Sequence, residues 1–380
     1  MSSHANPDIV TDGLAFIYDT GSGKSYKGEP TVNLAGSIVK NFSSWNGLTG
    51  STEYYTTSTG GQGVKLITTA SGGVQWYSFS TIYNIQASTQ YTISATVKYI
   101  GGTPHPNLLY VRQYDANGQT SESGKFTTAN ERDLGGGWKR IWRTFTTDAT
   151  TTHINLQGYE YTTGKTIHIQ DLQFEQKGHA TQFVNGTRST TQGLLDLTKN
   201  ETITLSNMSY DSNAQMSFDG TDDQFLISNP GVGTSFSIET VIKVDSYSNG
   251  PIFVSPNSVG IDHFFRVNSN GTIRANFVEV PDTANDGYTS TTVINTGEYY
   301  HVVISKTPSN GTIYVNGVAE DSHTPTLPAA AWTGAWRIGA RWNNTYNLNG
   351  EIPILKVYNK ALTAAEVLQS YNATKDRFIR

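Results

Sequence analysis

The chain of 380 residues contains no cysteine, which excludes a disulfide framework and any metal site built on thiolates. Only 15% of its residues are charged, and the formal net charge is −5. It has no cluster of lysine and arginine, so the concentrated basic surface that phosphate binding needs is missing, and we expect no nucleic-acid partner. No apolar run approaches about 18 residues, and we therefore expect no membrane insertion.

Two further absences concern targeting and repeats. Residues 1–7 carry neither a basic segment nor an apolar core, so we expect a protein made in the cytoplasm of its host without a signal peptide. The chain also has no heptad repeat, no β-helical repeat and no long glycine-rich stalk. A fibre shaft built from such repeats is therefore excluded.

Because charged residues are few, glycine, serine, threonine and asparagine make up much of the chain, together with 21 Tyr and 7 Trp. Short segments in which apolar and polar residues alternate recur along the chain, as at residues 91–99, 142–145, 167–170, 236–244 and 301–305. Alternation with a period of two is typical of strands that bury one face. The sequence therefore predicts an all-β protein made of two antiparallel β-sandwich or jelly-roll domains, with one short C-terminal helix.

The helix is predicted from Thr363 to about Thr374. Thr363 can cap the first turn, and Glu366, three residues later, can reach back to the Thr363 amide. The apolar residues Val367 and Tyr371 then lie on one side. We expect this terminal helix to pack on the edge of a sandwich.

Two segments carry a resemblance to a known family. Residues 215–227 read as a strand, the acidic turn Asp-Gly-Thr-Asp-Asp at 219–223, and a second strand. Residues 354–368 form a matching tail that contains the phrase Val-Tyr-Asn-Lys-Ala-Leu-Thr. Together they resemble the laminin-G-like (concanavalin A-like) sandwich domains of bacterial surface proteins and tailed-phage virions. The resemblance implies a fold that displays or binds and seldom catalyses.

The first strand of this family is matched by residues 13–19, but the Asp-Leu-Thr segment that usually follows comes only at residues 196–198. The stretch between them includes residues 137–146 and 167–175, which resemble carbohydrate-binding-module-like jelly rolls. An exposed loop tolerates an inserted domain whose two ends lie close together. The sequence therefore favours a jelly roll inserted into a laminin-G-like sandwich.

We accordingly predict three parts of the chain. Residues 1–30 form an N-terminal arm and the first strand of the sandwich, residues 31–188 form the inserted jelly roll, and residues 189–380 form the remainder of the sandwich plus the helix. The alternative is two consecutive domains that meet near residue 188. Pairing of residues 13–18 with the C-terminal or with the N-terminal domain distinguishes the two arrangements.

Candidate sugar-binding residues occur in the predicted jelly roll. Alternation along residues 108–114 puts Tyr110, Arg112 and Tyr114 on one strand face. Aromatic rings can stack on sugar faces, while amides and arginine can hydrogen-bond sugar hydroxyls. Asn155 and Gln157 on another predicted strand could line the same sheet. We predict a carbohydrate-binding site at these five residues, and a structural or intersubunit role for the tyrosines is the alternative.

Calcium is the candidate ion, although no cofactor is required. Asp219, Asp222 and Asp223 could offer carboxylate oxygens from one turn, and the resemblance to jelly rolls places Asp171 where such domains hold a structural calcium. The alternative is that Asp219 and Gly220 make the turn while Asp222 and Asp223 cap loop amides.

Signals of catalysis are missing. Hydrolases built on this sandwich usually present their carboxylates in a Glu-x-Asp-x-x-Glu pattern, which the chain lacks. Glu239 lies on a predicted strand, but its same-face neighbours Ser237 and Val241 carry no carboxylate. The chain contains no nucleophile elbow, zinc-protease motif or phosphate loop. We predict that the protein is not an enzyme and has no catalytic residue.

The resemblance implies a structural protein on the surface of a virion, as a capsid decoration or head fibre rather than a tail fibre. Its expected partners are other virion proteins and further copies of itself, with weak binding of host or environmental glycans. A bacterial carbohydrate-binding adhesin is one alternative, and a polysaccharide-degrading enzyme is another. The missing signal peptide counts against the first, and the missing carboxylate pattern counts against the second.

Overall fold

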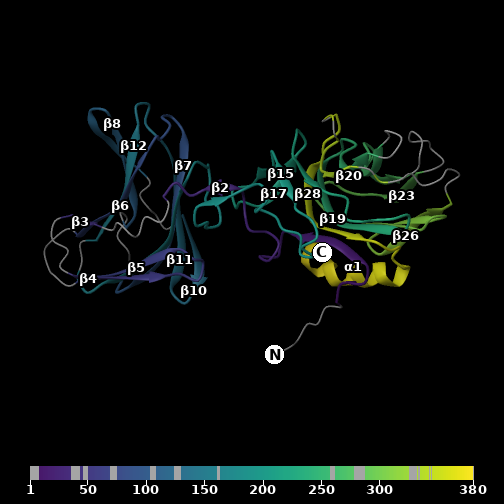
Figure 1. Cartoon of the computed structure of the whole chain (residues 1–380), viewed down its shortest axis with the longest axis horizontal. Helices are drawn as coiled ribbons and strands as arrows, with labels where there is room; N and C mark the ends of the chain where they lie inside the picture. The colour runs from purple at the N-terminus through teal and green to yellow at the C-terminus, as the bar shows by residue number, and fades with distance from the viewer. Residues whose placement is uncertain are drawn as a thin grey trace. The chain divides into compact units, whose positions relative to one another are not determined.

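A computed structural model describes the chain from residue 8 to residue 379, apart from residues 36–42, 46–49, 69–74, 103–107, 124–129, 161–162, 257–261, 278–286, 325–331, 333, 342 and 344. Strands account for 53% of the residues and helix for 5%, with one α-helix near the C-terminus among the described residues (Figure 1). The predicted all-β class and the single C-terminal helix are therefore confirmed.

The chain forms two compact units. One consists of three stretches, residues 1–28, 190–211 and 215–380, and we call it the discontinuous unit. The other consists of residues 29–189 with 212–214, and we call it the inserted unit.

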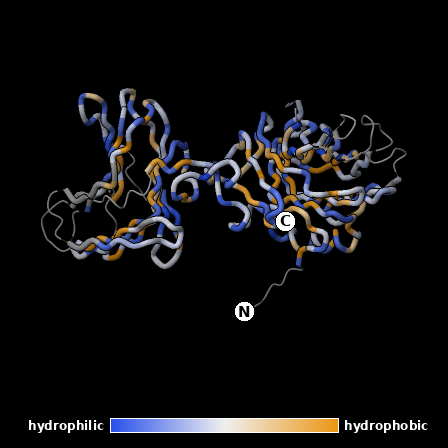
Figure 2. Tube along the Cα trace, in the orientation of Figure 1, coloured by the Kyte–Doolittle hydropathy of each residue, from blue (hydrophilic) through white to orange (hydrophobic). Residues whose placement is uncertain are grey.

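The discontinuous unit contains two sheets. The eight-stranded sheet consists of β1 (Leu14–Asp19), β16 (Ser209–Tyr210), β17 (Met216–Asp219), β19 (Phe236–Ser246), β24 (Tyr299–Lys306), β25 (Gly311–Val315), β26 (Val318–His323) and β28 (Asn349–Tyr358). The seven-stranded sheet consists of β15 (Thr204–Ser206), β18 (Gln224–Ile227), β20 (Pro251–Pro256), β21 (Asp262–Val267), β22 (Thr272–Asn276), β23 (Tyr288–Val293) and β27 (Trp336–Ile338). A large apolar core lies between them, and Figure 2 shows the hydrophobic residues gathered inside the unit.

Strand β1 belongs to the eight-stranded sheet although the inserted unit follows it in the chain. It pairs antiparallel with β28, with Leu14 opposite Tyr358 and Asp19 opposite Ile354. On return from the inserted unit, the carboxylate of Asp196 accepts a hydrogen bond from the Ile17 amide at 3.1 Å. Residues 13–18 thus pair with the C-terminal part of the chain, which is the arrangement that an insertion requires.

The helix α1 (Ala364–Phe378) begins with the capping box expected from the sequence. Thr363 accepts a hydrogen bond from the Glu366 amide, and the Glu366 side chain accepts one from the Thr363 amide. The helix buries Val367 in a small apolar cluster with Val303, Tyr314 and Tyr358 of the sheet. It therefore covers the outer face of the eight-stranded sheet, and the expectation that it packs on the sandwich edge is wrong.

The inserted unit is a second antiparallel sandwich. Its six-stranded sheet consists of β4 (Gly50–Thr56), β5 (Gln62–Thr68), β7 (Gln90–Ile100), β10 (Glu131–Gly135), β11 (Trp138–Thr146) and β13 (Thr166–Glu175). Its five-stranded sheet consists of β3 (Ser43–Trp45), β6 (Gln75–Tyr83), β8 (Tyr110–Asp115), β9 (Gly118–Ser123) and β12 (His153–Glu160). Buried aliphatic residues from both sheets, such as Ile93, Val111, Ile154 and Ile169, form one core.

The two ends of the inserted unit are joined to each other. Strand β2 (Thr31–Val32) at the entry pairs with β14 (Thr187–Arg188) at the exit. The guanidinium of Arg188 donates to the Glu29 carbonyl at 3.0 Å, and the Thr31 hydroxyl donates to Glu175 at 2.8 Å. These bonds hold the entry and the exit of the inserted unit close together. A loop can accept such a unit with little change in the distance between its own ends.

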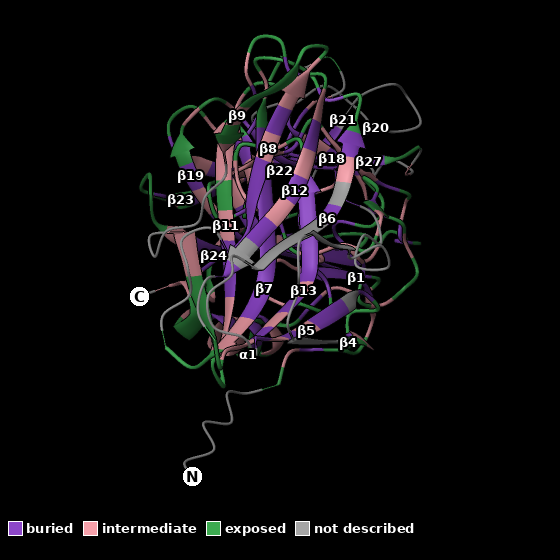
Figure 3. Ribbon diagram, turned by 90° about the vertical axis from the view of Figure 1, so that its left-hand side faces the viewer, coloured by how far each residue is buried: buried purple, intermediate pink, exposed green. Residues whose placement is uncertain are grey.

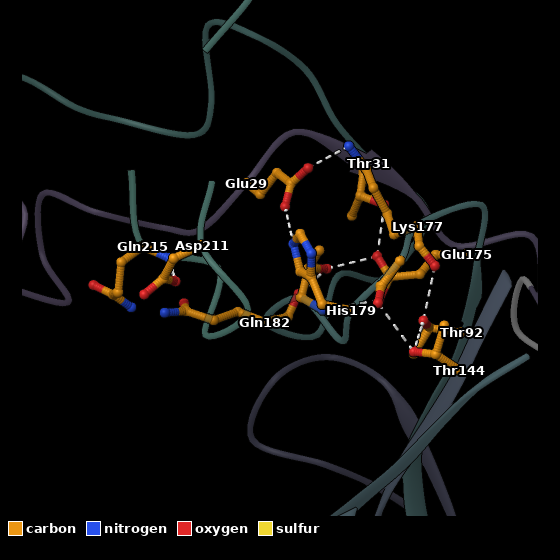
Figure 4. Close-up of polar contacts among 12 residues, drawn as sticks. Glu29, Thr31, Thr92, Thr144, Glu175, Lys177, His179, Gln182, Asp211 and Gln215 are labelled. Atoms are coloured by element: carbon orange, nitrogen blue, oxygen red, sulfur yellow. Dashed lines mark hydrogen bonds and ion pairs between the residues drawn. The ribbon is translucent and has the colours of Figure 1, made fainter. Parts of the chain in front are cut away.

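Glu29 is the charged centre of this closure (Figure 4). Its side chain is 4% exposed and bonds both Lys177 and His179. Burial alone would raise the pKa of Glu29, but hydrogen bonds and charge from His179 and Lys177 outweigh burial and lower it. The bond from Glu29 raises the pKa of His179 against the opposing effect of burial.

The closure gives a prediction for pH-dependent stability. The contribution of Glu29 to the free energy of unfolding is lost as pH falls below about 4.5, and that of His179 is lost as pH rises above about 6.5. The inserted unit is therefore stabilised most by these bonds between the two values. At about pH 6, Glu29→Gln should lower the free energy of unfolding of the inserted unit by about 1.5–3 kcal/mol. Chemical denaturation followed by intrinsic fluorescence measures this change.

Glu53→Gln is the matched control, because Glu53 pairs with Lys65 at 3.1 Å while its own side chain is 60% exposed. Its cost should stay below about 1 kcal/mol. Equal costs for the two variants would contradict the role given to Glu29.

Candidate functional site

Strand β12 aligns the residues predicted to bind sugar. Across its pairing with β8, Gln157 lies opposite Tyr110, Asn155 opposite Arg112, and His153 opposite Tyr114. Directly opposed residues of antiparallel strands point to the same side of a sheet. All five predicted residues therefore share one face of the five-stranded sheet. The residues between them, including Val111 and Ile154, face the core, and Figure 3 shows this alternation of burial along β12.

Tyr110 differs from the expectation of an exposed sugar platform. Its side chain is fully buried, and its hydroxyl donates to the Gln157 side-chain oxygen at 3.0 Å. The Arg112 guanidinium lies 5.8 Å from the centre of the Tyr110 ring and forms an ion pair with Glu122 at 3.1 Å. The Tyr110 ring therefore offers no open surface for stacking.

An aromatic stack occupies the end of the same face. The His153 ring lies between Tyr114, at 5.0 Å and an interplanar angle of 11°, and Tyr83, at 5.4 Å and 27°. Tyr83 comes from β6, which pairs with the other side of β12 and places Tyr83 opposite His153. Tyr83 is 68% exposed. The stack therefore presents one open ring held in place by two others.

Tyr83 and His153 were missed in the sequence. His153 does have a signal, because it lies two residues before Asn155 and so shares its face. Tyr83 has none, since its position depends on which strand pairs with β12 and in which register.

Polar groups flank the stack. The Thr81 and Asn155 side chains are half-buried, and these two residues lie opposite each other across β6 and β12. Burial lowers the pKa of Arg112, but Tyr110, Glu122 and Tyr114 outweigh this effect and raise it, so the guanidinium stays charged. The face thus combines an exposed ring with an amide, a hydroxyl and a cation that can hydrogen-bond a ligand.

Asp171 lies in the core of the inserted unit. It has a positive φ of 52° where the pairing of β13 with β7 is irregular. Its Oδ1 accepts hydrogen bonds from Thr59 at 2.6 Å and Thr57 at 3.3 Å, and its carbonyl accepts one from buried Arg140 at 2.8 Å. Burial lowers the pKa of Arg140 to about 10, with Asp171 and Glu175 opposing. Hydroxyl donors and a guanidinium therefore surround Asp171, and calcium at this residue stays a prediction.

The acidic turn brings three carboxylates together. One oxygen each of Asp219, Asp222 and Asp223 lies within 4.8 Å of the others, the one such group among the described residues that could hold a metal ion. Asp219 accepts the Thr221 amide, Asp223 accepts the Asp219 amide at 2.7 Å, and Asp222 accepts the Asn207 side-chain amide. These are the bonds of a capped turn.

Burial also raises the pKa of Asp223 to about 6, with the Asp219 charge adding to this rise and hydrogen bonds from the Asp219 amide and Ser209 opposing it. A carboxyl group with a raised pKa is harder to ionise, so a cation bound at this turn would have to offset the cost of ionising Asp223. Calcium at Asp219, Asp222 and Asp223 likewise stays a prediction.

Part of the discontinuous unit is similar to a known protein family. Residues 219–368 match a laminin G family model described as the concanavalin A-like lectin/glucanases superfamily. The discontinuous unit has a concanavalin A-like fold. The match begins at the acidic turn and ends within α1, as the two segments singled out in the sequence suggest. No curated protein matches the chain.

Several solved structures are similar to part of the chain. A Trypanosoma rangeli sialidase is 14% identical with a TM-score of 0.39, over 48% of this chain and 31% of the sialidase. Domain 4 of an extracellular arabinanase from Geobacillus stearothermophilus is 18% identical with a TM-score of 0.37, over 48% and 93%. The binding domain of botulinum neurotoxin serotype D is 13% identical with a TM-score of 0.37, over 48% and 50%. The chain thus spans about a third of the sialidase and half of the toxin domain.

Within the described part of the chain, no helix has the length and apolar character that a membrane span needs.

The two tyrosines should differ in their effect on stability. Tyr110→Ala removes a fully buried ring and should lower the free energy of unfolding of the inserted unit by about 3–5 kcal/mol. Tyr83→Ala removes an exposed ring and one stacking contact, and should cost less than about 1.5 kcal/mol. Thermal or chemical unfolding of the two variants distinguishes these roles, and similar losses would contradict the placement of Tyr83 at the surface.

Proposed function

We propose that the protein is a non-enzymatic, carbohydrate-binding protein displayed on a virion surface, and that its inserted unit binds sugar at the aromatic stack. The exposed Tyr83 ring, held by His153 and Tyr114, is the observation that carries the proposal. A pyranose has one face of C–H groups that can pack on such a ring, while its hydroxyls need hydrogen-bond partners at the rim.

The stack makes Tyr83 suitable as a platform. Contact with His153 already restricts the Tyr83 ring, so little further side-chain entropy is lost when a sugar stacks on it. Asn155 and Thr81 of the same face provide an amide and a hydroxyl that can bond sugar hydroxyls. An exposed ring on an open face buries only one side of a ligand, so we expect weak binding, with a Kd of about 1 mM, or about −4 kcal/mol per site.

The non-enzymatic part of the proposal rests on the carboxylate that a sandwich hydrolase would need. Glu239 is 1% exposed and accepts hydrogen bonds from Lys356 at 2.6 Å and Tyr358 at 3.1 Å. A carboxylate so enclosed cannot approach a glycosidic bond. Incubation with polysaccharides should therefore release no reducing ends, whereas release would favour the polysaccharide-degrading alternative.

The virion part of the proposal rests on the resemblance of residues 215–227 and 354–368 to sandwich domains of tailed-phage virions. We place the protein as a capsid decoration or head fibre, in contact with other virion proteins and with copies of itself. A bacterial carbohydrate-binding adhesin is the alternative.

Labelling of purified particles with an antibody against the chain tests this placement. We expect label on the capsid surface. Label confined to the tail would contradict the capsid assignment, and detection only on bacterial cells would favour the adhesin.

Glycan binding can be tested on an array of neutral oligosaccharides, at densities that allow many weak contacts at once. Tyr83→Ala should reduce the signal at least about tenfold, which corresponds to the stacking energy of about 1.4 kcal/mol. Tyr54→Ala is the matched control, since Tyr54 is a 52% exposed tyrosine on β4 of the other sheet of the same unit. The control should bind like the unaltered protein. Equal binding by all three proteins would reject the aromatic stack as the site.

A further inference from the structure

A row of side chains crosses the outer face of the six-stranded sheet of the inserted unit. Trp138 of β11 lies opposite Lys98 of β7, and Lys98 lies opposite His168 of β13 on its other side. His168 lies opposite Lys65 of β5, which in turn lies opposite Glu53 of β4. The residues that precede Lys98 and His168 along their strands belong to the core. The row therefore points away from the core, and we call these residues the transverse row.

One part of this outer face is covered by the chain itself. Near the start of β7, Thr92 donates to the Lys177 carbonyl at 2.8 Å, and near the end of β13, Gln173 donates to the Thr181 hydroxyl at 2.8 Å. Thr92 and Gln173 are fully buried beneath the segment that leaves β13. In the transverse row, by contrast, Glu53 is exposed and the other residues are half-buried. A ligand can therefore reach the row from solvent.

Three aromatic side chains meet at the transverse row. The His168 ring lies 5.6 Å from the Trp138 ring and 6.1 Å from the Tyr55 ring, centre to centre. The Tyr55 ring lies over Gly63 of β5, where a Cβ atom would come within 2.3 Å of it. The Tyr55 hydroxyl donates to the Gln170 side-chain oxygen at 3.0 Å. Neighbouring side chains thus hold the rings of Trp138 and Tyr55, against which the C–H face of a sugar can pack.

Positive charge exceeds negative charge in the transverse row. Lys65 pairs with Glu53 at 3.1 Å. Lys98 has no carboxylate partner among the described residues, and its ammonium lies 5.9 Å from the centre of the Trp138 ring. Burial lowers the pKa of His168, and the two lysine charges lower it further against the opposing carboxylate, so its ring is neutral at pH 7. The row therefore holds one ammonium group whose charge is not balanced.

A further cation lies beside the row. Arg132 of the edge strand β10 is exposed and lies opposite Arg140 of β11. Arg140 is itself buried and donates to the Ser94 hydroxyl at 2.7 Å and to the Asp171 carbonyl at 2.8 Å. The formal net charge of the whole chain is −5. Strand pairing thus gathers cations from distant positions of an acidic chain, and this favours an anionic ligand at the face.

We propose that the outer face of the six-stranded sheet binds oligosaccharides that carry carboxylate or sulfate groups. A sugar ring packs on Trp138 or Tyr55, and its anionic group pairs with Lys98. Because the Lys98 ammonium lies beside the Trp138 ring, both contacts can form with one sugar residue. A nucleic acid is a poorer fit, since its phosphates need a concentrated basic surface. This site lies on the other sheet from the aromatic stack and is independent of the binding proposed there.

Calorimetric titration of the full chain with an oligogalacturonate tests the site, and the fully methyl-esterified oligomer is the matched uncharged ligand. The acidic form should bind at least about fivefold more tightly, as expected for one partly exposed ion pair. Its binding should weaken as the salt concentration rises from about 0.05 M to about 0.5 M. A heparin-derived oligosaccharide is the sulfated counterpart, and saturable binding of either acidic probe supports the proposal.

Substitutions locate the site. Lys98→Gln should weaken binding of the acidic probe about fivefold and leave binding of the methyl ester unchanged. Lys139→Gln is the matched control, because it removes the same charge at the position next to Trp138, where Lys139 lies opposite Val97 and pairs with Glu131. The control should bind like the unaltered protein. Trp138→Ala should weaken binding of both ligands at least about tenfold, and Lys98→Gln keeps the proposal testable if that variant does not fold.

Ring resonances of the histidines give a second readout. Those of His168 should shift and saturate with the acidic probe, while those of His153 in the aromatic stack should not move. The two sites are thereby distinguished, so that either can fail without the other. No saturable binding of either acidic probe, equal losses in Lys98→Gln and Lys139→Gln, or saturation that leaves His168 unchanged would overturn the proposal.

Discussion

The pairing of β1 with β28 is the constraint on which the rest of the structure depends. It completes the eight-stranded sheet with a strand from the start of the chain, and the Tyr18 hydroxyl donates to the Ile352 carbonyl, 334 residues later, at 2.9 Å. The chain also returns beside β1 after the inserted unit, because the Asp196 carboxylate accepts a hydrogen bond from the Ile17 amide. The bonds of Glu29, Arg188 and the β2–β14 pair supply that return. The two ends of the inserted unit therefore lie close together, and this allows β1 to complete the eight-stranded sheet.

The two units differ in how far the outer faces of their sheets are covered. In the discontinuous unit, both ends of the chain are engaged in covering the outer face of a sheet, where they enclose the ion cluster around Glu239. In the inserted unit, one face of the five-stranded sheet instead carries the exposed residue Tyr83. The proposal of a non-enzymatic, sugar-binding protein rests on the burial of Glu239 in one unit and the exposure of Tyr83 in the other.

Much of this could be predicted from local sequence, and the rest depended on contacts between distant strands. Alternation placed Tyr110, Arg112 and Tyr114 on one face, and the Thr363–Glu366 capping box located the start of α1, because both are set within a few residues. Alternation gives the face of a residue but not its depth, so it could not show that Tyr110 is buried. Tyr83 was missed because its approach to His153 depends on the register of β6 against β12. The position of α1 on the sheet face depends on packing against distant residues such as Val303 and Tyr314, which no local pattern connects to the helix.

The central claim is that sugar binds at the aromatic stack of the inserted unit. The most direct test is a titration of the full chain, labelled selectively at histidine, with an oligosaccharide that it binds on an array. The account predicts that the ring resonances of His153 shift and saturate, while those of His263 and His301, which are buried in the discontinuous unit, do not move. Saturable binding that leaves His153 unchanged and shifts a histidine of the discontinuous unit would contradict it.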